Sequence, residues 1–172
     1  PVIRLTGRAP ADEPGPIPGR PGNGEKDGLD LSSLYTTSGL LGGDPFPSRI
    51  DALLVAGDSG VAALPDLAAR LGLEAIGLTV PIVERAGSVA RPASQPPMVL
   101  AGTANRLTTQ LADSGRIDLS GLQPGEGLIE LVPKAFGDKP ALVVTGADEA
   151  GARRALEQVA LTFPNLGERG KD

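Results

Sequence analysis

Between Lys139 and Leu166 the chain changes from a continuous apolar run to a repeat with helical spacing. Residues 141–145 are apolar and partly β-branched, which is typical of a strand covered on both faces. After Gly146, apolar residues recur at the spacing of one helix face: Ala152, Ala155, Leu156, Val159, Ala160 and Phe163. Because Pro164 cannot continue a helix, the pattern predicts a strand, a glycine turn and a helix over Glu149–Phe163. Asp148 is placed to cap that helix.

Two earlier segments repeat this order of strand, glycine and amphipathic helix. The first has a strand over Ile50–Ala56 and a helix over Ser59–Leu71, and the second has a strand over Met98–Ala101 and a helix over Thr103–Ser114. The capping candidates are Asp58 or Ser59 in the first unit and Thr103 or Asn105 in the second. Pro65 leaves two alternatives for the first helix: a shorter helix that begins at this proline, or a longer one that it kinks.

The remaining strands complete a mixed sheet. Alternating residues over Ile76–Ile82 predict a half-buried strand, and Pro81 favours an edge position because proline cannot donate to a ladder. A strand over Gly127–Val132 is joined by the connection Pro133–Pro140 to the strand before Gly146, which predicts an antiparallel hairpin. The sequence therefore predicts an α/β fold with a sheet of about five strands and three helices.

Glycine and proline divide the chain into parts. Residues 1–48 are rich in both, so we predict an extended arm there, with a mobile loop over Asp12–Gly28 and an apparent strand over Val2–Thr6. We expect the α/β domain to span residues 49–166 and a polar tail to span residues 167–172. Because the chain begins at Pro1, we interpret it as a piece of something longer, from which a targeting signal could have been removed.

Composition excludes several classes of function. The 172 residues contain no His and no Cys, which excludes a His-based triad, a thiolate nucleophile and His- or Cys-ligated metal. The net charge of −5 comes with scattered basic residues, so we expect no nucleic-acid partner. No apolar run approaches the roughly 20 residues that a membrane helix needs.

The three strand-end turns are the first candidate binding site. They place free helix N–H groups at one edge of the sheet, which favours anions, and the residues concerned are Gly57, Asp58, Gly102, Thr103, Gly146 and Asp148. None of the turns has the glycine pattern of a phosphate loop, and the capping aspartates would compete with an anion for the same N–H groups. We therefore favour structural turns over ligand sites. Their nearly even spacing is consistent with three ordinary turns or with an internal repeat.

Carboxylates and lysines supply the other candidates. Asp44, Asp51 and Asp58 could form a calcium site, but solvated turn carboxylates fit their spacing better. The set Glu126, Asp148 and Glu149 could serve glycoside hydrolysis, although the chain has no Trp and one Tyr to form a sugar platform, so helix capping and surface roles are favoured. Lys134 and Lys139 flank the hairpin connection and receive no role. We assign no catalytic residue, no metal and no cofactor.

Residues 98–166 resemble the small α/β accessory domain that precedes the catalytic barrel of glycoside hydrolases such as family 20 hexosaminidases and α-glucuronidases. The resemblance rests on three short motifs: Glu126, Gly127 and Leu128; Gly146, Ala147 and Asp148; and Gly151, Ala155 and Val159. A similar arrangement occurs in periplasmic subunits of bacterial cellulose synthesis. In these families the domain is not catalytic and packs against its neighbour, so the resemblance transfers no catalytic residue.

These observations lead to three functional hypotheses. The first is a non-catalytic accessory domain of a larger, extracytoplasmic bacterial protein that acts on or near carbohydrate, with a neighbouring domain or chain of that protein as its partner. The second is a small-anion or sugar binding module that uses the glycine turns. The third is a carboxylate-based hydrolase, which ranks last because the chain shows no catalytic constellation.

Overall fold

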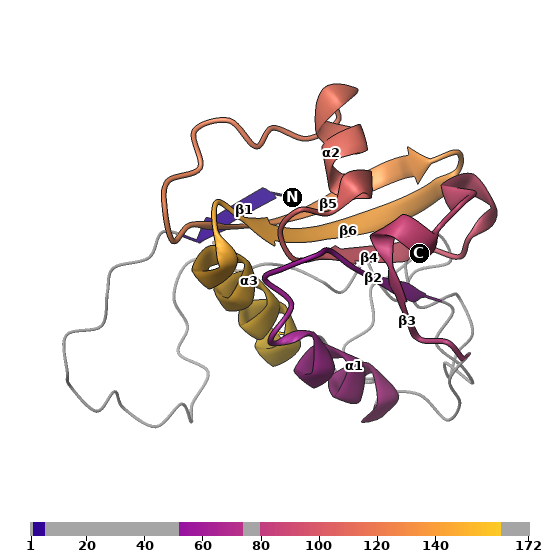
Figure 1. Cartoon of the computed structure of the whole chain (residues 1–172), viewed down its shortest axis with the longest axis horizontal. Helices are drawn as coiled ribbons and strands as arrows, with labels where there is room; N and C mark the ends of the chain where they lie inside the picture. The colour runs from indigo at the N-terminus through magenta and orange to yellow at the C-terminus, as the bar shows by residue number, and fades with distance from the viewer. Residues whose placement is uncertain (1, 6–51, 74–79, 163–172) are drawn as a thin grey trace, which may run out of the picture.

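The fold is an α/β sandwich built on one mixed sheet (Figure 1). The structure, a computed structural model, describes residues 2–5, 52–73 and 80–162. Six strands follow the order β1-β5-β6-β4-β2-β3. The strand bounds are Val2–Leu5 (β1), Leu53–Ala56 (β2), Val83–Arg85 (β3), Met98–Ala101 (β4), Gly127–Phe136 (β5) and Lys139–Gly146 (β6). The predicted α/β class with a mixed sheet and three helices is confirmed.

Strand direction divides the sheet into two parts. β6, β4, β2 and β3 are parallel neighbours, whereas β5 is antiparallel to both β6 and β1. The predicted hairpin is therefore present, with β5 and β6 as its arms. β1 agrees with the strand predicted over Val2–Thr6, at the start of the range predicted as an extended arm, and it forms an edge of the sheet.

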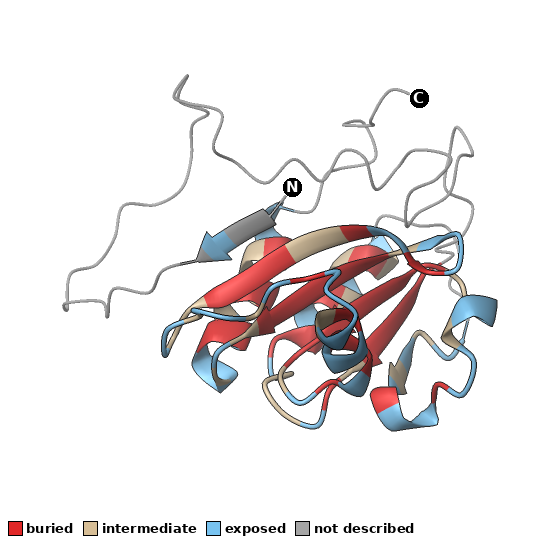
Figure 2. Ribbon diagram, turned by 90° about the horizontal axis from the view of Figure 1, so that it is seen from above, coloured by how far each residue is buried: buried red, intermediate tan, exposed pale blue. Residues whose placement is uncertain are grey.

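The two faces of the sheet are covered by different helices. α1 (Leu64–Leu73) and α3 (Glu149–Thr162) bury one face, where Leu54, Leu142 and Leu156 belong to one hydrophobic cluster. α2 (Arg106–Asp113) and the short helix η2 (Ala86–Ser88) bury the other face, around Leu100, Leu107 and other apolar residues. Figure 2 shows the central strands as a continuous buried layer. This two-sided burial explains why the central strands β2 and β4 consist of apolar residues alone.

The helices begin where their caps allow. α3 starts at Glu149 as predicted, and its predicted last residue, Phe163, lies outside the described residues. α2 starts at Arg106, later than predicted, because Asn105 and not Thr103 is its N-cap. α1 starts at Leu64 with Pro65 as its second residue, so the shorter of the two alternatives is correct. A proline in the first turn loses no helical hydrogen bond.

The strand predictions need two corrections. Residues 80–82 are not a strand, and β3 spans Val83–Arg85, directly after the predicted range; residues 76–79 lie outside the description. Pro81 has no N–H for a ladder, and β3 is an outer strand, as the proline indicated. The hairpin arms are also longer than predicted, because the register shift between Val132 and Phe136 accommodates the interruption at Pro133. Residues 12–28 and 167–172 lie outside the described part of the chain.

Candidate functional site

The three glycine turns lie side by side at one edge of the sheet. β6, β4 and β2 are adjacent and parallel, so Gly146, Gly102 and Gly57 all follow the carboxyl ends of neighbouring strands. The sequence-based expectation of a shared edge is thus met. In open α/β sheets, ligands bind at this edge where the strand order reverses. That reversal falls between β2 and β4, because the chain leaves β2 for β3 on one side and returns to β4 on the other.

Main-chain atoms close the gap between the first two turns. A Cβ added at Gly57 would lie 2.2 Å from the Thr103 carbonyl oxygen, and one added at Gly102 would lie 2.4 Å from the Ser59 carbonyl oxygen. The Thr103 N–H donates to the Ser59 carbonyl at 2.9 Å, and the hydroxyls of these two residues are 2.7 Å apart. The usual ligand crevice is therefore filled by the protein itself.

The N-terminus of α2 is occupied by its own cap. The side-chain oxygen of Asn105 accepts a hydrogen bond from the Leu107 N–H at 3.0 Å, and its amide nitrogen donates to the Val55 carbonyl at 3.0 Å. Asn105 is 2% exposed, so it joins helix α2 to strand β2 inside the protein. Thr103 instead bonds to the neighbouring turn. An incoming anion would have to displace Asn105 from both partners.

Asp148 uses both carboxylate oxygens to hold the third turn. One oxygen accepts from the Gly151 N–H at 2.8 Å as a helix cap, and the other accepts from the Gly125 N–H at 2.8 Å. The hydrogen bonds from Gly151 and then Gly125 hold the pKa of Asp148 below its ordinary value, because they favour the charged form. The sequence predicted the cap but not the bond to Gly125, which lies 23 positions away.

Three glycines allow helix α3 to approach the hairpin closely. A Cβ on Gly151 would lie 2.1 Å from the Glu126 carbonyl oxygen, one on Gly127 would lie 2.6 Å from the Gly151 carbonyl oxygen, and one on Gly146 would lie 2.3 Å from the Ala152 nitrogen. These glycines belong to the three motifs on which the family resemblance rests. The close packing of main-chain atoms explains why glycine occupies these three positions, without a ligand.

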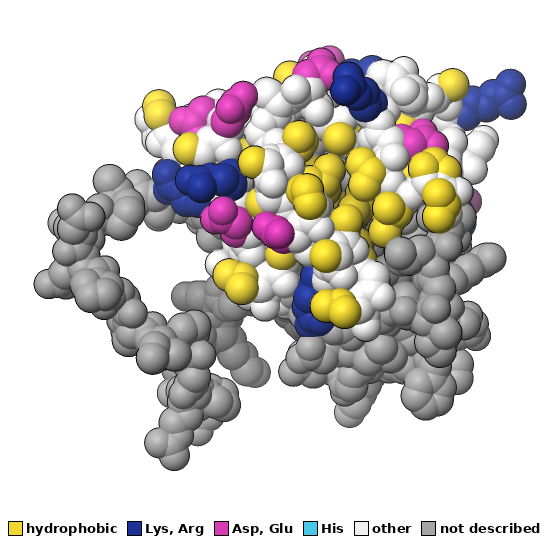
Figure 3. Space-filling model, turned by 60° about the horizontal axis from the view of Figure 1, so that its bottom comes forward, with side chains coloured by type: hydrophobic (Ala, Val, Ile, Leu, Met, Phe, Trp, Pro, Cys, Tyr) yellow, Lys and Arg dark blue, Asp and Glu magenta, His cyan; other side chains and the backbone are white. Residues whose placement is uncertain are grey.

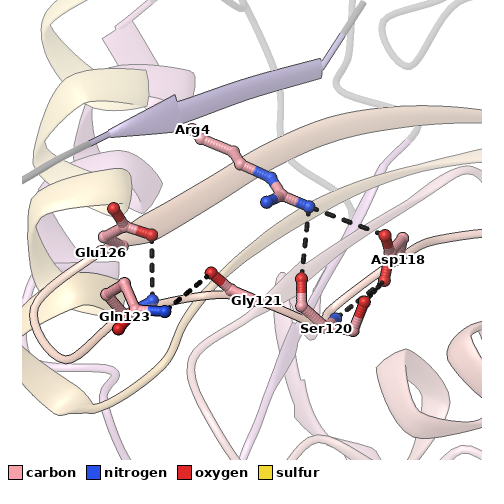
Figure 4. A network of polar contacts seen from close by, with 6 residues as sticks. All are labelled: Arg4, Asp118, Ser120, Gly121, Gln123 and Glu126. Carbon is pink, nitrogen blue, oxygen red and sulfur yellow. Dashed lines mark hydrogen bonds and ion pairs between the residues drawn. The ribbon is translucent and has the colours of Figure 1, made fainter.

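The other candidate carboxylates, those of Glu126 and Glu149, differ in their surroundings. The Glu126 carboxylate accepts a hydrogen bond from the Gln123 N–H at 2.9 Å (Figure 4). Glu149 is exposed in the first turn of α3. In the same loop, Asp118 accepts from the Ser120 hydroxyl at 2.5 Å and from the Ser120 N–H at 2.8 Å. These bonds lower the pKa of Asp118, first through the hydroxyl. Arg4 reaches Asp118 at 3.7 Å, so the network joins β1 to this loop.

The structure describes one of the three calcium candidates and both of the lysines that flank the hairpin connection. Asp44 and Asp51 lie outside the described residues, and Asp58 is exposed. Within the part of the chain that the structure describes, no group of three or more His, Cys, Asp or Glu residues could hold a metal ion. Lys134 and Lys139 are both exposed, and Lys134 lies in the irregular stretch of β5 with a φ of 53°.

An open pocket lies beside the first turn. It has a volume of about 730 Å³ and lies between α1 and the carboxyl ends of β2 and β3. Two of the predicted turn residues, Gly57 and Asp58, contribute to its wall. Val83 and Arg85 also line it, and sequence reasoning missed both because it placed β3 too early.

Comparison with known families finds no matching family model, and no curated protein matches the sequence. None of the helices in the described ranges combines the length and the apolar character needed to cross a membrane.

Proposed function

We propose that this chain is a non-catalytic α/β accessory domain that packs against a neighbouring domain or chain of a larger, extracytoplasmic bacterial protein acting on or near carbohydrate. The observation that carries the proposal is that main-chain atoms close the crevice between the carboxyl ends of β2 and β4. Thr103 and Ser59 occupy the position between β2 and β4 where a ligand would enter an open α/β sheet.

The side chains with catalytic potential support the same proposal. General acid–base chemistry requires a carboxylate that can reach a substrate with a suitable pKa. Asp148 is held in its charged form by main-chain donors on both oxygens, and Glu126 accepts from a local main-chain N–H. These interactions stabilise the turns around α3. They argue against the carboxylate-based hydrolase, which has no other described constellation to rely on.

Apolar side chains at the opposite edge of the sheet suit a packing role. Leu73, Val80 and Leu161 are 80%, 83% and 82% exposed. Leu73 ends α1, Leu161 lies in the last turn of α3, and Val80 precedes β3. α1 connects the parallel strands β2 and β3 and runs antiparallel to them, so Leu73 and Val80 lie toward the edge where these strands begin. Leu161 is at the end of α3 that is far from the Gly146 turn. We assign the contact with the neighbouring domain to this edge, and we call it the apolar edge.

The carbohydrate and extracytoplasmic parts of the proposal rest on the resemblance of residues 98–166. The arrangement of β4, α2, the hairpin and α3 contains every motif of that resemblance. Gly127, Gly146 and Gly151 meet at one point, which gives the motifs a common structural reason. A domain selected for this packing has no need of a catalytic group of its own.

The test is to express the complete polypeptide that contains this chain, and to express the 172-residue chain and the remainder separately. We expect the two parts to bind one another, and Leu73→Lys with Leu161→Lys to weaken that binding. Glu149→Gln, an exposed change at the other edge, is the matched control. Failure of the two parts to associate, or a reading frame that encodes these 172 residues alone, would contradict the proposal.

The binding-module alternative is favoured by one observation, the pocket beside Gly57 and Asp58. Main-chain atoms lie close to the glycine at all three turns. A small-anion or sugar module would therefore use the pocket that lies beside the first turn rather than the turns themselves. Titration of the chain with phosphate and with simple sugars tests it, and a saturable response to either would support it.

A further inference from the structure

The pocket beside the first turn exists because α1 covers β2 but leaves β3 partly open. Paired residues of parallel strands face the same side, and the pairs Leu54–Val83 and Ala56–Arg85 place Val83 and Arg85 on the α1 face of the sheet. Leu54 on this face is fully buried, whereas Val83 is 38% exposed. The space next to Val83 is therefore an open pocket alongside the packed core.

The wall of this pocket is mainly aliphatic. Its apolar residues come from β2, β3, α1 and the loop before α1: Ala56, Val61, Leu64, Pro65, Ala68 and Val83. Figure 3 views the side of the molecule on which α1 and α3 lie, and hydrophobic side chains gather across the centre of this face, with charged ones around them. The volume of about 730 Å³ is within the usual range for small-molecule sites.

Charges of opposite sign contribute to the pocket from neighbouring strand ends. Asp58 follows β2 and Arg85 ends β3, and both residues are exposed. Among the described residues neither makes an ion pair, with the other or elsewhere, so both charges remain available to a ligand. Glu84 also lines the pocket, but the alternation of β3 places its side chain on the opposite face, that of Val55.

We propose that this pocket binds a small zwitterion with an aliphatic side chain, that is, a free α-amino acid such as leucine. Its carboxylate pairs with the Arg85 guanidinium, which matches carboxylate geometry with two parallel N–H donors. Its ammonium group pairs with Asp58, and its side chain packs against Val61, Ala68 and Val83. Phosphate fits the pocket poorly, because the Asp58 carboxylate beside Arg85 would repel it. A sugar also fits poorly, because the lining has few hydrogen-bonding side chains and no aromatic ring.

The proposal is independent of the accessory role, because the pocket and the apolar edge are at different ends of α1. The first experiment is calorimetric titration of the whole chain with L-leucine, 4-methylpentanoate, isoamylamine and glucose. Leucine carries both charges and the aliphatic chain, 4-methylpentanoate lacks only the ammonium group, and isoamylamine lacks only the carboxylate. We expect saturable binding of leucine, binding at least ten-fold weaker for each single-charge analogue, and no binding of glucose. Absence of saturable binding by leucine, or equal affinity for 4-methylpentanoate, overturns the proposal.

Variants locate the site. Arg85→Gln removes the guanidinium and should weaken leucine binding at least ten-fold without changing the affinity for isoamylamine. Ala68→Phe places a ring in the pocket from α1 and should abolish binding of both ligands. Arg91→Gln is the matched control, because Arg91 is exposed and outside the pocket. Leucine binding that is unchanged in Arg85→Gln would refute the assignment, even if Ala68→Phe failed to fold.

Discussion

Replacing Gly151 with alanine tests the closest contact in the structure. Its Cβ would lie 2.1 Å from the Glu126 carbonyl oxygen and 2.6 Å from the Glu126 carbonyl carbon. Both neighbours are main-chain atoms, so no rotation of a side chain relieves the overlap. Because non-bonded heavy atoms prefer separations of about 3.5 Å, α3 and the start of β5 would have to separate by roughly 1 Å. That movement disturbs Ala152 and Ala155, which are both fully buried.

Two opposing terms set the magnitude. Alanine is favoured over glycine inside a helix by about 1 kcal/mol, whereas overpacking against a rigid neighbour costs about 3 kcal/mol, the upper end of the usual range. We therefore expect Gly151→Ala to lower the free energy of unfolding by about 2 kcal/mol. For a chain of this length, this loss corresponds to a fall in Tm of about 4–8 °C.

The assay is urea and thermal unfolding followed by circular dichroism. Gly87→Ala is the control, because Gly87 is exposed and a Cβ there meets nothing within 4 Å. We expect the control to change the free energy of unfolding by less than about 0.5 kcal/mol. If Gly151→Ala were as stable as the wild type, or more stable, the gain in helix propensity would not be opposed by a steric cost at the Glu126 carbonyl. The close contact between α3 and the hairpin would then be refuted.

Further predictions concern the turns. Gly57→Ala and Gly102→Ala should each lower the free energy of unfolding by about 2 kcal/mol or more, since each Cβ meets a carbonyl oxygen. Urea unfolding that shows either variant to be as stable as the wild type would contradict the close contact between these two turns. Asn105→Ala should lower the free energy of unfolding by about 2–3 kcal/mol, because it removes the α2 cap and leaves the Val55 carbonyl without its side-chain donor. Equal urea midpoints for the variant and the wild type would refute that role. The pKa of Asp148 is lowered by folding, so its contribution is present above its unfolded value of about 3.9 and is lost as the pH falls through the folded value. Asp148→Asn should therefore lose less stability than the wild type between neutral and strongly acidic pH, as measured by urea midpoints. If the urea midpoints of both proteins fell equally on acidification, the role of the Asp148 charge would be contradicted.

The features that the sequence predicted correctly are those encoded locally. The start of α3 follows from Asp148, a helical stripe and the preceding glycine, all within a few residues. The hairpin follows from two apolar runs joined by a short connection. The extra length of its arms could not be predicted, because Pro133 and Pro140 normally interrupt a ladder. In the folded protein both prolines lie between the paired positions Val132–Ala141 and Phe136–Lys139.

The features that the sequence missed depend on contacts between distant elements. The bond between Asp148 and Gly125 and the contact between Gly57 and Thr103 require the sheet order to be known. The pocket depends on how far α1 extends over β3, which no periodicity reports. Residues 57–63 were partly assigned to a helix, because Val61 continues the apolar spacing of α1 although it lies in the loop.

Hydrogen exchange tests the accessory-domain proposal most directly. The measurement compares the isolated 172-residue chain with the same chain inside the complete polypeptide. We predict slower exchange in the complete protein for amides at the ends of α1 and α3, near Leu73 and Leu161, where a neighbour would cover the apolar edge. Exchange at the closed turns around Gly102 and Gly146 should be unchanged. Equal exchange at the apolar edge in both forms, or new protection confined to the turns, would contradict the account.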